Sequence, residues 1–366
     1  MKNEDKKETK KAKEDSINAD KISEVESKAE KLKEKALSEE NDSLNSNSSN
    51  LSKTEEKQKI KQAKEEFKAS KKEIESKFKE YKDKIPSIKE EIKNNSISKI
   101  ESEFTDEEEK KKELKKLNKK LRNGYYPVDE KIAIKLSGAY KYYFSSDIIT
   151  KVIDNLDLEI MRNEVTVILG PSGSGKTTLL NLISGLDKPS AGDVITNNYN
   201  LSWIKERKLI YFRKVNTSFI FQQYNLIPTL NVEDNIKTGF EIRNKENEDI
   251  DIYDLMKKIN IYESRKKYPY QLSGGQLQRT AIARTIAKNV DIIFADEPTG
   301  ALDEDMSKEV LSILLKITKQ YNKTLIIVTH NPQIAKVANR VLRFSNGKIV
   351  KDEVNKNPVD PMSLKW

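Results

Sequence analysis

The sequence Gly170-Pro171-Ser172-Gly173-Ser174-Gly175-Lys176-Thr177-Thr178 decides the fold. It matches the pattern G-x-x-x-x-G-K-[ST], and it stands between an apolar, β-branched run (165–169) and a second apolar segment (179–183). A strand, a glycine-rich turn and a helix start are what a phosphate-binding loop requires, because backbone N–H groups can then surround an anion at the positive end of the helix dipole. The lysine supplies a charge for the β- and γ-phosphates, and the threonine after it supplies a hydroxyl for Mg²⁺. The stretch therefore predicts a nucleotide site.

A second stretch, Asp291-Ile292-Ile293-Phe294-Ala295-Asp296-Glu297-Pro298, brings two acids to the end of an apolar strand. Ligands bind at the carboxyl ends of strands in open α/β sheets, and a bound cation compensates the cost of burying carboxylates there. We expect Asp296 to bind Mg²⁺ and Glu297 to accept a proton from the attacking water. His330, the only histidine, follows another apolar run (325–328). Its place beside the expected phosphate site favours a catalytic role over a structural one.

A third stretch, Leu272-Ser273-Gly274-Gly275-Gln276-Leu277-Gln278-Arg279, begins a helix that continues through residue 284. Ser273 and the glycine pair form a second helix start that can bind an anion. One chain would then present two phosphate-binding helix starts to a single triphosphate. This surplus suggests that the second start serves a neighbouring copy of the chain.

Amino-acid composition limits the number of domains, the chemistry available to the chain and its location in the cell. The 366 residues leave room for two or three domains, and the absence of cysteine excludes disulfides, thiolate metal sites and cysteine catalysis. No apolar run reaches the ~18 residues of a membrane-spanning helix, and the first residues lack the apolar core of a signal peptide. We therefore expect a cytosolic chain unless a partner holds it at a membrane. The net charge of +9 hints at an anionic partner, although Lys and Glu are mixed throughout.

Residues 1–124 differ in amino-acid composition from the rest of the chain. They contain 34 Lys+Arg and 30 Asp+Glu, a net charge of +4. Residues 1–52 have the composition of a disordered segment. Over residues 53–85, apolar side chains recur at spacings of three and four, which predicts a helix that Pro86 ends. The stripe on this helix consists of Ile60, Ala63, Phe67, Ile74, Phe78, Tyr81 and Ile85.

A second, shorter helix is expected after it. Thr105 and Glu108 fit a capping box at its start, and Gly124 marks its end. Three readings of the segment stay open: a coiled-coil or docking segment, a solvated helical spacer, and a loose contact with an anionic membrane surface, for which a net charge of +4 over 124 residues is thin. The stripes on the two helices are one residue wide, so we expect the segment to contribute nothing to the core of the domain that follows.

From about residue 131 the sequence reads as a mixed α/β domain. Residues 230–268 have a polar, helical pattern and lack the alternation of strands, which predicts an inserted helical subdomain. Strands are expected at 132–136, 152–160, 193–195, 218–221, 292–295, 325–328, 341–344 and 348–350.

With these motifs the chain resembles the ATP-binding-cassette (ABC) ATPases over about residues 131–352. The phosphate loop is similar to the Walker A loop of that family, the run ending at Glu297 to Walker B with its catalytic glutamate, and residues 272–276 to the LSGGQ signature. Further matches are the Q-loop glutamine at Gln222, the D-loop aspartate at Asp303, the switch histidine at His330, and an adenine-stacking aromatic at Tyr143, with Tyr142 as the alternative.

The resemblance implies an α/β P-loop NTPase fold, the ABC cassette, with a helical subdomain at about 228–285 and a C-terminal tail at 353–366. The charged extension 1–124 has no counterpart in the family's core. ATP and Mg²⁺ are the implied cofactors. The implied catalytic residues are Glu297, His330 and Gln222, and the implied metal ligands are Thr177, Gln222 and Asp296.

The resemblance also implies a head-to-tail pair of cassettes, either a homodimer or two related chains, around two ATP molecules. Each site would take Ser273, Gly274, Gly275 and Gln276 from the other copy.

A separate transmembrane permease would hold the pair at the cytoplasmic face of the membrane. The stretches 221–228 and 295–300 look most like the lipoprotein-releasing and macrolide-export type of subunit. The alternative is an ATPase that drives a permease-like partner for regulation without transport, as in the related cell-division pair.

No nucleic acid is expected as a partner. Chromosome-structure and DNA-repair relatives carry a long coiled coil between phosphate loop and signature, and only 97 residues separate Lys176 from Ser273. Ribosome-binding translation factors of the family usually carry two cassettes, whereas this chain has one Walker A and one signature.

Overall fold

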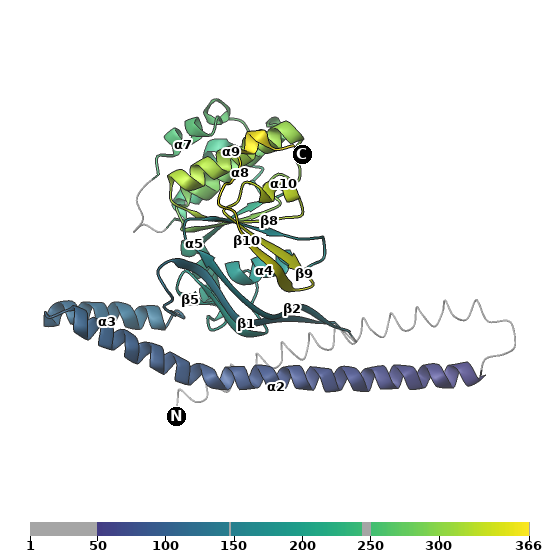
Figure 1. Cartoon of the computed structure of the whole chain (residues 1–366). Coiled ribbons are helices and arrows are strands. Elements are labelled where there is room, and N and C mark those ends of the chain that lie inside the picture. The colour runs from purple at the N-terminus through teal and green to yellow at the C-terminus, as the bar shows by residue number, and fades with distance from the viewer. Residues whose placement is uncertain (1–49, 146–147, 244–249, 366) are drawn as a thin grey trace. The chain divides into compact units, whose positions relative to one another are not determined.

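The computed structural model describes residues 50–145, 148–243 and 250–365. The chain divides into two compact units, residues 1–65 and 66–366. In the first unit the described residues, 50–65, are helical, so the predicted disorder of 1–52 fails at 50–52 and otherwise lies outside the described residues. The second unit contains two β-sheets and the helices that cover them (Figure 1).

One sheet is antiparallel, in the order β2-β1-β4-β5. The predicted strand at 132–136 is confirmed, and it continues through the aromatic cluster that follows as far as residue 145. Its long pairing with β2 explains the extension, because the register runs from Ile132↔Met161 to Ser145↔Ile148. The strands are β1 (Ile132–Ser145), β2 (Ile148–Met161), β4 (Ala191–Thr196) and β5 (Tyr199–Asn200).

The other sheet has six strands in the order β10-β9-β3-β8-β7-β6. All neighbours are parallel except β10, which pairs antiparallel with β9. Each predicted strand of this sheet is confirmed. The strands are β3 (Val165–Leu169), β6 (Thr217–Phe221), β7 (Ile292–Asp296), β8 (Thr324–Thr329), β9 (Arg340–Ser345) and β10 (Lys348–Val354).

The central strands are apolar on both faces because both faces are buried. Along β3, Val167 and Leu169 belong to one core cluster and Ile168 belongs to the other. The first cluster contains residues of α8 and α9, and the second contains residues of α4 and of the antiparallel sheet. Figure 1 shows the same arrangement, with α8 and α9 on one side of the parallel strands and α4 with β1 and β2 on the other.

Nine α-helices lie in the described residues, together with three short 3₁₀ helices. The range predicted for the helical subdomain, about 228–285, contains α6, α7, η1, η2 and most of α8. The α-helices are α2 (Asn50–Glu103), α3 (Glu107–Leu121), α4 (Lys176–Ser184), α5 (Glu206–Asn216), α6 (Val232–Glu241), α7 (Ile252–Lys258), α8 (Gly274–Ala287), α9 (Glu304–Gln320) and α10 (Pro332–Ala335). The 3₁₀ helices are η1 (Tyr262–Ser264), η2 (Pro269–Gln271) and η3 (Pro361–Ser363).

Helix α2 corrects one prediction, because it passes through Pro86 instead of ending there. A proline inside a helix loses one backbone hydrogen bond and costs about 3 kcal/mol. The apolar spacing continues beyond the proline, however, and Ile88, Ile92 and Ile100 are half-buried. Their burial offsets the cost and maintains the helix.

The start of α3 corrects a second prediction. Asp106, not Thr105, caps the helix, and its carboxylate accepts hydrogen bonds from the backbone N–H groups of Glu108 and Glu109. A carboxylate at the positive end of the helix dipole is a stronger acceptor than a hydroxyl. The true cap therefore lies one residue beyond the predicted one.

We refer to residues 66–121, which comprise most of α2 and all of α3, as the arm. Tyr81 Oη donates a hydrogen bond to Asp193 Oδ1 (2.5 Å) and accepts one from Trp203 Nε1 (3.1 Å). The rings of Phe78 and Tyr142 pack with centroids 6.0 Å apart. Burial and the Asp193 carboxylate raise the pKa of Tyr81, so its hydroxyl remains a donor. The arm thus packs on the antiparallel sheet.

The arm joins neither of the two large core clusters, although Leu117 of α3 is buried, so the predicted absence from the core holds for the clusters and fails at Leu117. Among the described residues, neither core cluster contains a residue before Ala133. Of the predicted stripe, Phe67, Ile74, Phe78, Tyr81 and Ile85 are half-buried, while the side chains of Ile60 and Ala63 lie outside the described set.

The C-terminal segment behaves differently from a free tail. Leu364 is buried and belongs to the first core cluster, although it lies in the predicted tail 353–366. Within residues 50–145, 148–243 and 250–365, we find no helix that is both long and apolar enough to cross a membrane.

Candidate functional site

The phosphate loop connects β3 to α4, as the sequence predicted. Gly175 is the N-cap of α4 and has a left-handed backbone with φ +99°. A Cβ at this position would lie 3.1 Å from the Val152 carbonyl oxygen, so glycine is the residue that fits. Lys176 is buried, and its Nζ donates hydrogen bonds of 2.8 Å to the carbonyls of Gly170 and Pro171. Its ammonium group therefore lies inside the curl of the loop.

Two further side chains suit this loop to an anion. Ser174 Oγ is buried without a hydrogen-bond partner in the described part of the chain. Such a group is costly unless a ligand or water satisfies it, and a phosphate oxygen could do so. Thr177 is exposed in the first turn of α4, where its hydroxyl can reach a ligand held by the loop.

The carboxyl ends of β6, β7 and β8 lie in register at the same edge of the sheet. Asp296 pairs with Phe221 on one side and with Val328 on the other. The residues that follow these three, namely Glu297, Gln222 and Thr329, therefore emerge at one edge of the sheet. The strand register thus brings together the predicted acids and the predicted Q-loop glutamine.

Asp296 is a carboxylate without local compensation. It is half-buried, and no hydrogen bond or ion pair to its side chain is found among the described residues. Burial raises its pKa, the charge of Glu297 raises it further, and the Lys176 ammonium lowers it. A divalent cation would supply the missing positive charge, so the electrostatics fit the predicted role in binding Mg²⁺.

Glu297 is held rigidly at the same edge. Its Oε2 accepts a hydrogen bond from Thr329 Oγ1 (2.8 Å), and its Oε1 accepts one from the His330 backbone N–H (2.9 Å). The His330 ring is also in contact, with Nδ1 2.6 Å from Oε1. Glu297 has φ +46°, a left-handed conformation that costs a non-glycine residue about 1 kcal/mol or more. Such strain concentrates at functional sites, where surrounding contacts hold the residue in place.

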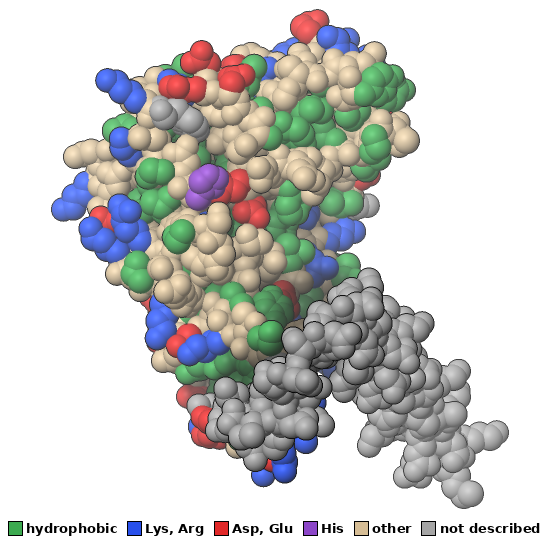
Figure 2. All heavy atoms as spheres, turned by 90° about the vertical axis from the view of Figure 1, so that its right-hand side faces the viewer, with side chains coloured by type: hydrophobic (Ala, Val, Ile, Leu, Met, Phe, Trp, Pro, Cys, Tyr) green, Lys and Arg blue, Asp and Glu red, His purple; other side chains and the backbone are tan. Residues whose placement is uncertain are grey.

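Gln222 and His330 flank the glutamate, whereas Asp303 lies further along the chain. A Cβ on Gly300 would lie 2.9 Å from Gln222 Nε2 and 3.4 Å from Glu297 Cβ, so the glutamine side chain is beside the glutamate. The His330 side chain is 63% exposed, and Figure 2 shows the single histidine at the surface next to acidic side chains. Asp303 caps α9 by accepting a hydrogen bond from the Met306 N–H (2.9 Å).

The predicted signature residues form a separate cluster. Ser273 is the N-cap of α8, and it exchanges capping-box hydrogen bonds with Gln276. Gly275 packs so closely on α9 that a Cβ would lie 2.4 Å from Met306 Sδ. No hydrogen bond in the described part of the chain joins this cluster to the phosphate loop. Within one copy, the N-terminus of α8 is therefore formed, but among the described residues it makes no hydrogen bond to the phosphate loop at the N-terminus of α4.

The two candidate aromatic residues lie in different environments because they alternate along β1. Tyr142 packs against Phe78 of the arm and stacks on Tyr140. Tyr143 remains 42% exposed, and its hydroxyl donates a hydrogen bond to Asp187 Oδ2 (2.9 Å). A Thr178 hydroxyl contact lowers the pKa of Tyr143, although burial and Asp187 raise it overall. Tyr143 thus lies next to the phosphate loop.

Asp187 and Thr329 are site residues that the sequence reasoning missed. Lys141 Nζ donates hydrogen bonds of 2.8 Å to Asp187 Oδ1 and to the Lys188 carbonyl, and it lies 4.8 Å from the centroid of the Tyr143 ring. Burial tends to raise the pKa of Asp187, but the hydrogen bonds it accepts lower it overall. The sequence offered one signal for each residue. Asp187 is an acid that closely follows the expected phosphate-loop helix, and Thr329 directly precedes His330.

Comparisons with known proteins point to one protein family. The family model described as ABC transporter matches residues 153–300. The ABC transporter ATP-binding protein MG065 of Mycoplasma genitalium is 43% identical over 260 residues, which cover 70% of this chain and 56% of that protein. The lipoprotein-releasing system ATP-binding protein LolD of Buchnera aphidicola is 34% identical over 220 residues, which cover 60% of this chain and 96% of LolD.

Among solved structures, the chain is similar to the ATP-binding cassette MJ0796, described as a dimer in a post-hydrolysis state bound to ADP and Pi. The TM-score is 0.56 at 33% identity, with 61% of this chain and 99% of MJ0796 covered. The chain spans only about half the length of two Mycoplasma relatives, 56% of MG065 and 51% of its Mycoplasma pneumoniae homologue.

Proposed function

This chain belongs to the family of ABC transporter ATP-binding proteins, and from that premise we propose that it hydrolyses MgATP to drive a separate membrane permease. The observation that carries the proposal is the rigid placement of the Glu297 carboxylate, between Thr329 and His330, at the sheet edge that also presents Asp296. A strained glutamate beside an uncompensated aspartate suits the transfer of a phosphoryl group to water.

In the proposed reaction, water attacks the γ-phosphorus, ADP leaves, and Glu297 accepts the proton of the water. Gln222 and His330, which flank the carboxylate, would orient the water and the γ-phosphate. Lys176 would stabilise the charge on the phosphate oxygens, together with the backbone N–H groups of the loop.

Mg²⁺ would be held by Thr177, Gln222 and Asp296, and it would neutralise charge on the phosphate oxygens. Magnesium sites commonly combine few protein ligands with oxygens of the substrate. In keeping with this, the described residues contain no cluster of three His, Cys, Asp or Glu side chains that could hold a metal by themselves.

Tyr143 would stack on the adenine ring. Its exposure and its fixed position support it over Tyr142, which Phe78 and Tyr140 cover. In this reading Asp187 and Lys141 are positioning residues, because they hold the Tyr143 ring beside the phosphate loop without touching the phosphates.

The active unit would be a pair of cassettes in which Ser273, Gly274, Gly275 and Gln276 complete the site of the other copy. The separation of this cluster from the phosphate loop within one chain supports the sharing, as does the dimer described for MJ0796. We place the pair at the cytoplasmic face of the membrane, held there by the permease. The relatives are ATP-binding proteins of an ABC transporter and of a lipoprotein-releasing system, which supports transport over the purely regulatory alternative.

The test uses two inactive variants that complement one another only if sites are shared. Lys176→Ala weakens phosphate binding, and Ser273→Arg blocks the signature. In a heterodimer, both lesions fall in one composite site and the other site is intact. Mixing equal amounts should restore about a quarter of wild-type ATP hydrolysis, because half of the dimers are mixed and each has one good site.

The matched control mixes Lys176→Ala with the double variant Lys176→Ala, Ser273→Arg, a pair that contains no intact site. Recovery in the first mixture and not in the second supports the proposal. Absence of recovery, with heterodimers demonstrated by crosslinking, would overturn the shared site. A wild-type chain that does not hydrolyse ATP, alone or with its permease, would overturn the activity itself.

A further inference from the structure

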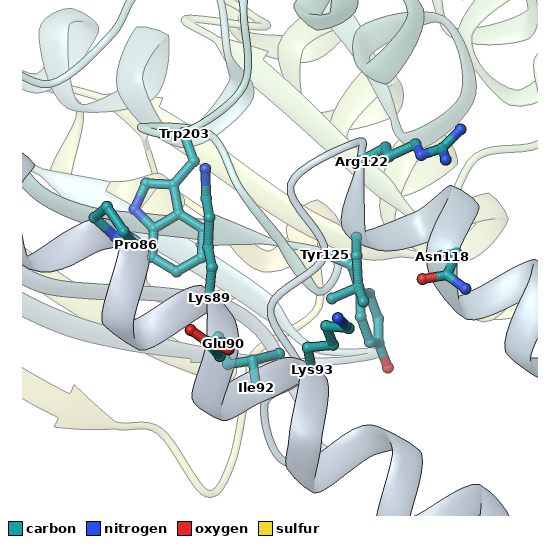
Figure 3. Close-up of a pocket in the computed structure, with 10 residues that line it drawn as sticks. Pro86, Lys89, Glu90, Ile92, Lys93, Asn118, Arg122, Tyr125 and Trp203 are labelled. Atoms are coloured by element: carbon teal, nitrogen blue, oxygen red, sulfur yellow. The ribbon is translucent and has the colours of Figure 1, made fainter.

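A groove along α3 is lined by basic side chains and lacks carboxylates. Its cations are Lys111, Lys115 and Lys119 from the arm, Arg122 at the C-cap of α3, and Lys208 from α5. We call these five residues the basic groove. The groove continues at Arg122 into a hollow of about 380 Å³ whose lining includes Lys89, Lys93, Trp203 and a single acid, Glu90 (Figure 3).

The groove lies in a basic part of an extension that is nearly balanced in charge as a whole. Residues 1–124 carry a net charge of only +4, because 30 acids accompany 34 bases. Residues 110–122, however, contain eight Lys and Arg and one acid, Glu113, which pairs with Lys116 (2.5 Å), while Glu107 pairs with Lys110 (3.1 Å). The lining of the groove contains no carboxylate.

The groove cations are exposed, and no ion pair is found for any of them among the described residues. Lys208 Nζ donates to the Arg122 carbonyl (2.6 Å), a neutral acceptor at the end of α3. Exposed lysines are commonly just solvated, but a one-sign groove creates a potential that attracts an extended anion. Spacing of four residues places Lys111, Lys115 and Lys119 in one row on the helix surface.

We propose that the basic groove binds the surface of an anionic lipid bilayer. Clusters of four to eight Lys and Arg residues are typical of segments that bind anionic headgroups. Apolar groups accompany the cations, as the bilayer interface favours: Leu114 lies in the groove, and Ile92 lies in the adjoining hollow.

The aromatic rings favour lipid over single-stranded nucleic acid as the partner. Nucleic-acid sites of that kind stack bases on open aromatic faces. Here the Trp203 ring is covered by Lys89 Nζ at 5.3 Å, and the Tyr125 ring is approached by Lys120 Nζ at 5.5 Å. Figure 3 shows Lys89 extending along Trp203, while Arg122 points away from the hollow. The faces of the Trp203 and Tyr125 rings are therefore covered by lysine side chains and are not open to stack on bases.

This lipid contact would add to attachment through a permease, and it is testable without one. The full chain is sedimented with vesicles of phosphatidylcholine alone and with vesicles that also contain phosphatidylglycerol. We expect binding to the second kind only, with affinity that falls as salt rises. The triple variant Lys111→Gln, Lys115→Gln, Lys119→Gln should bind at least about tenfold more weakly, since each groove cation near an anionic surface contributes several-fold. Glutamine forms helices well, so this variant should keep the melting temperature of wild type.

The matched control is Lys316→Gln, Lys319→Gln, Lys336→Gln, which removes the same charge from exposed positions of the cassette. It should bind vesicles within about twofold of wild type, because those lysines lie outside the groove. Three results would overturn the proposal: no binding of wild type to anionic vesicles, equal loss in both triple variants, or displacement of the vesicles by duplex or single-stranded nucleic acid at lower concentration. ATP hydrolysis should be unchanged in both variants, so failure here is distinguishable from failure of the proposed activity.

Discussion

The nucleotide edge of the parallel sheet and the arm on the antiparallel sheet are held in different ways. At the edge, Glu297 accepts hydrogen bonds from Thr329 and from His330, and it has a left-handed backbone conformation. All three residues lie at the carboxyl ends of buried strands. In the arm, Tyr81 reaches Asp193 across 112 positions of sequence, and the helix adds no residue to either described core cluster. From this difference we infer that the edge is organised for the proposed chemistry, whereas the arm is held by contacts at the surface of the antiparallel sheet. Changes at the edge should therefore alter rates, and changes in the arm should alter stability.

The largest effect is expected for Glu297→Gln. The amide keeps the shape of the side chain but cannot accept a proton, and general-base catalysis is typically worth ~10²–10⁴-fold. ATP turnover should fall by that factor while equilibrium binding of ATP is retained. The control is Glu80→Gln in the arm, which loses only an exposed contact with Lys84 and should keep the wild-type rate. A Glu297→Gln chain with more than half of normal turnover would contradict the assignment.

Removal of the arm should give the next largest effect, and it should affect stability. We expect a chain that starts near Asn123 to fold and to hydrolyse ATP near the full rate, because every proposed site residue, including the positioning residue Lys141, lies after Asn123. Its melting temperature should fall by roughly 5–10 °C, since Tyr142 and Trp203 lose their cover and each kcal/mol is worth about 2–4 °C in a domain of this size. Calorimetry and ATPase assays on both chains provide the measurement. A large loss of rate would show that the arm belongs to the catalytic region.

A smaller effect is expected when the support of Tyr143 is removed. Asp187→Ala frees the Tyr143 hydroxyl and the Lys141 ammonium, so the ring should stack less well on adenine. ATP affinity should fall by about three- to tenfold, the range that aromatic stacking typically contributes. Binding of tripolyphosphate, which has no base, should not change, and Asp106→Ala at the cap of α3 serves as the control in the arm. Equal weakening of both ligands would argue against Tyr143 as the adenine platform.

The smallest effect is expected for Tyr81→Phe in the arm. The change removes one hydroxyl that bonds Asp193 and Trp203, which is worth about 1 kcal/mol, or a melting temperature lower by about 2–4 °C. Because the folded state raises the pKa of Tyr81 above the ordinary value of 10.0, its contribution is complete below pH 10 and is lost as the pH rises further. The two proteins should therefore converge in stability above pH 10. Tyr270→Phe, at an exposed position, should match wild type at every pH.

Much of the fold and of the candidate site was readable from local sequence. The run 165–169, the glycines and Lys176 predicted β3, the loop and α4, because a phosphate loop needs specific backbone angles and N–H groups within a dozen residues. Asp296 and Glu297 were expected at the end of a buried strand, and the structure has them at the end of β7. Ser273 was expected at a helix start, and it is the N-cap of α8. In each case neighbours in sequence supply the turn, the cap or the burial.

Contacts between distant segments were decided only by the tertiary structure. Pro86 signals a helix end by local rules, yet α2 continues because Ile88 and Ile92 remain partly buried beyond it. The choice between Tyr142 and Tyr143 depends on which face of β1 the arm covers. Likewise, the basic residues of α3 form a groove together with Lys208 of α5, which contacts Arg122 across 86 positions of sequence. Short-range sequence specifies backbone geometry, whereas the neighbour of a side chain across the fold depends on packing that no local pattern encodes.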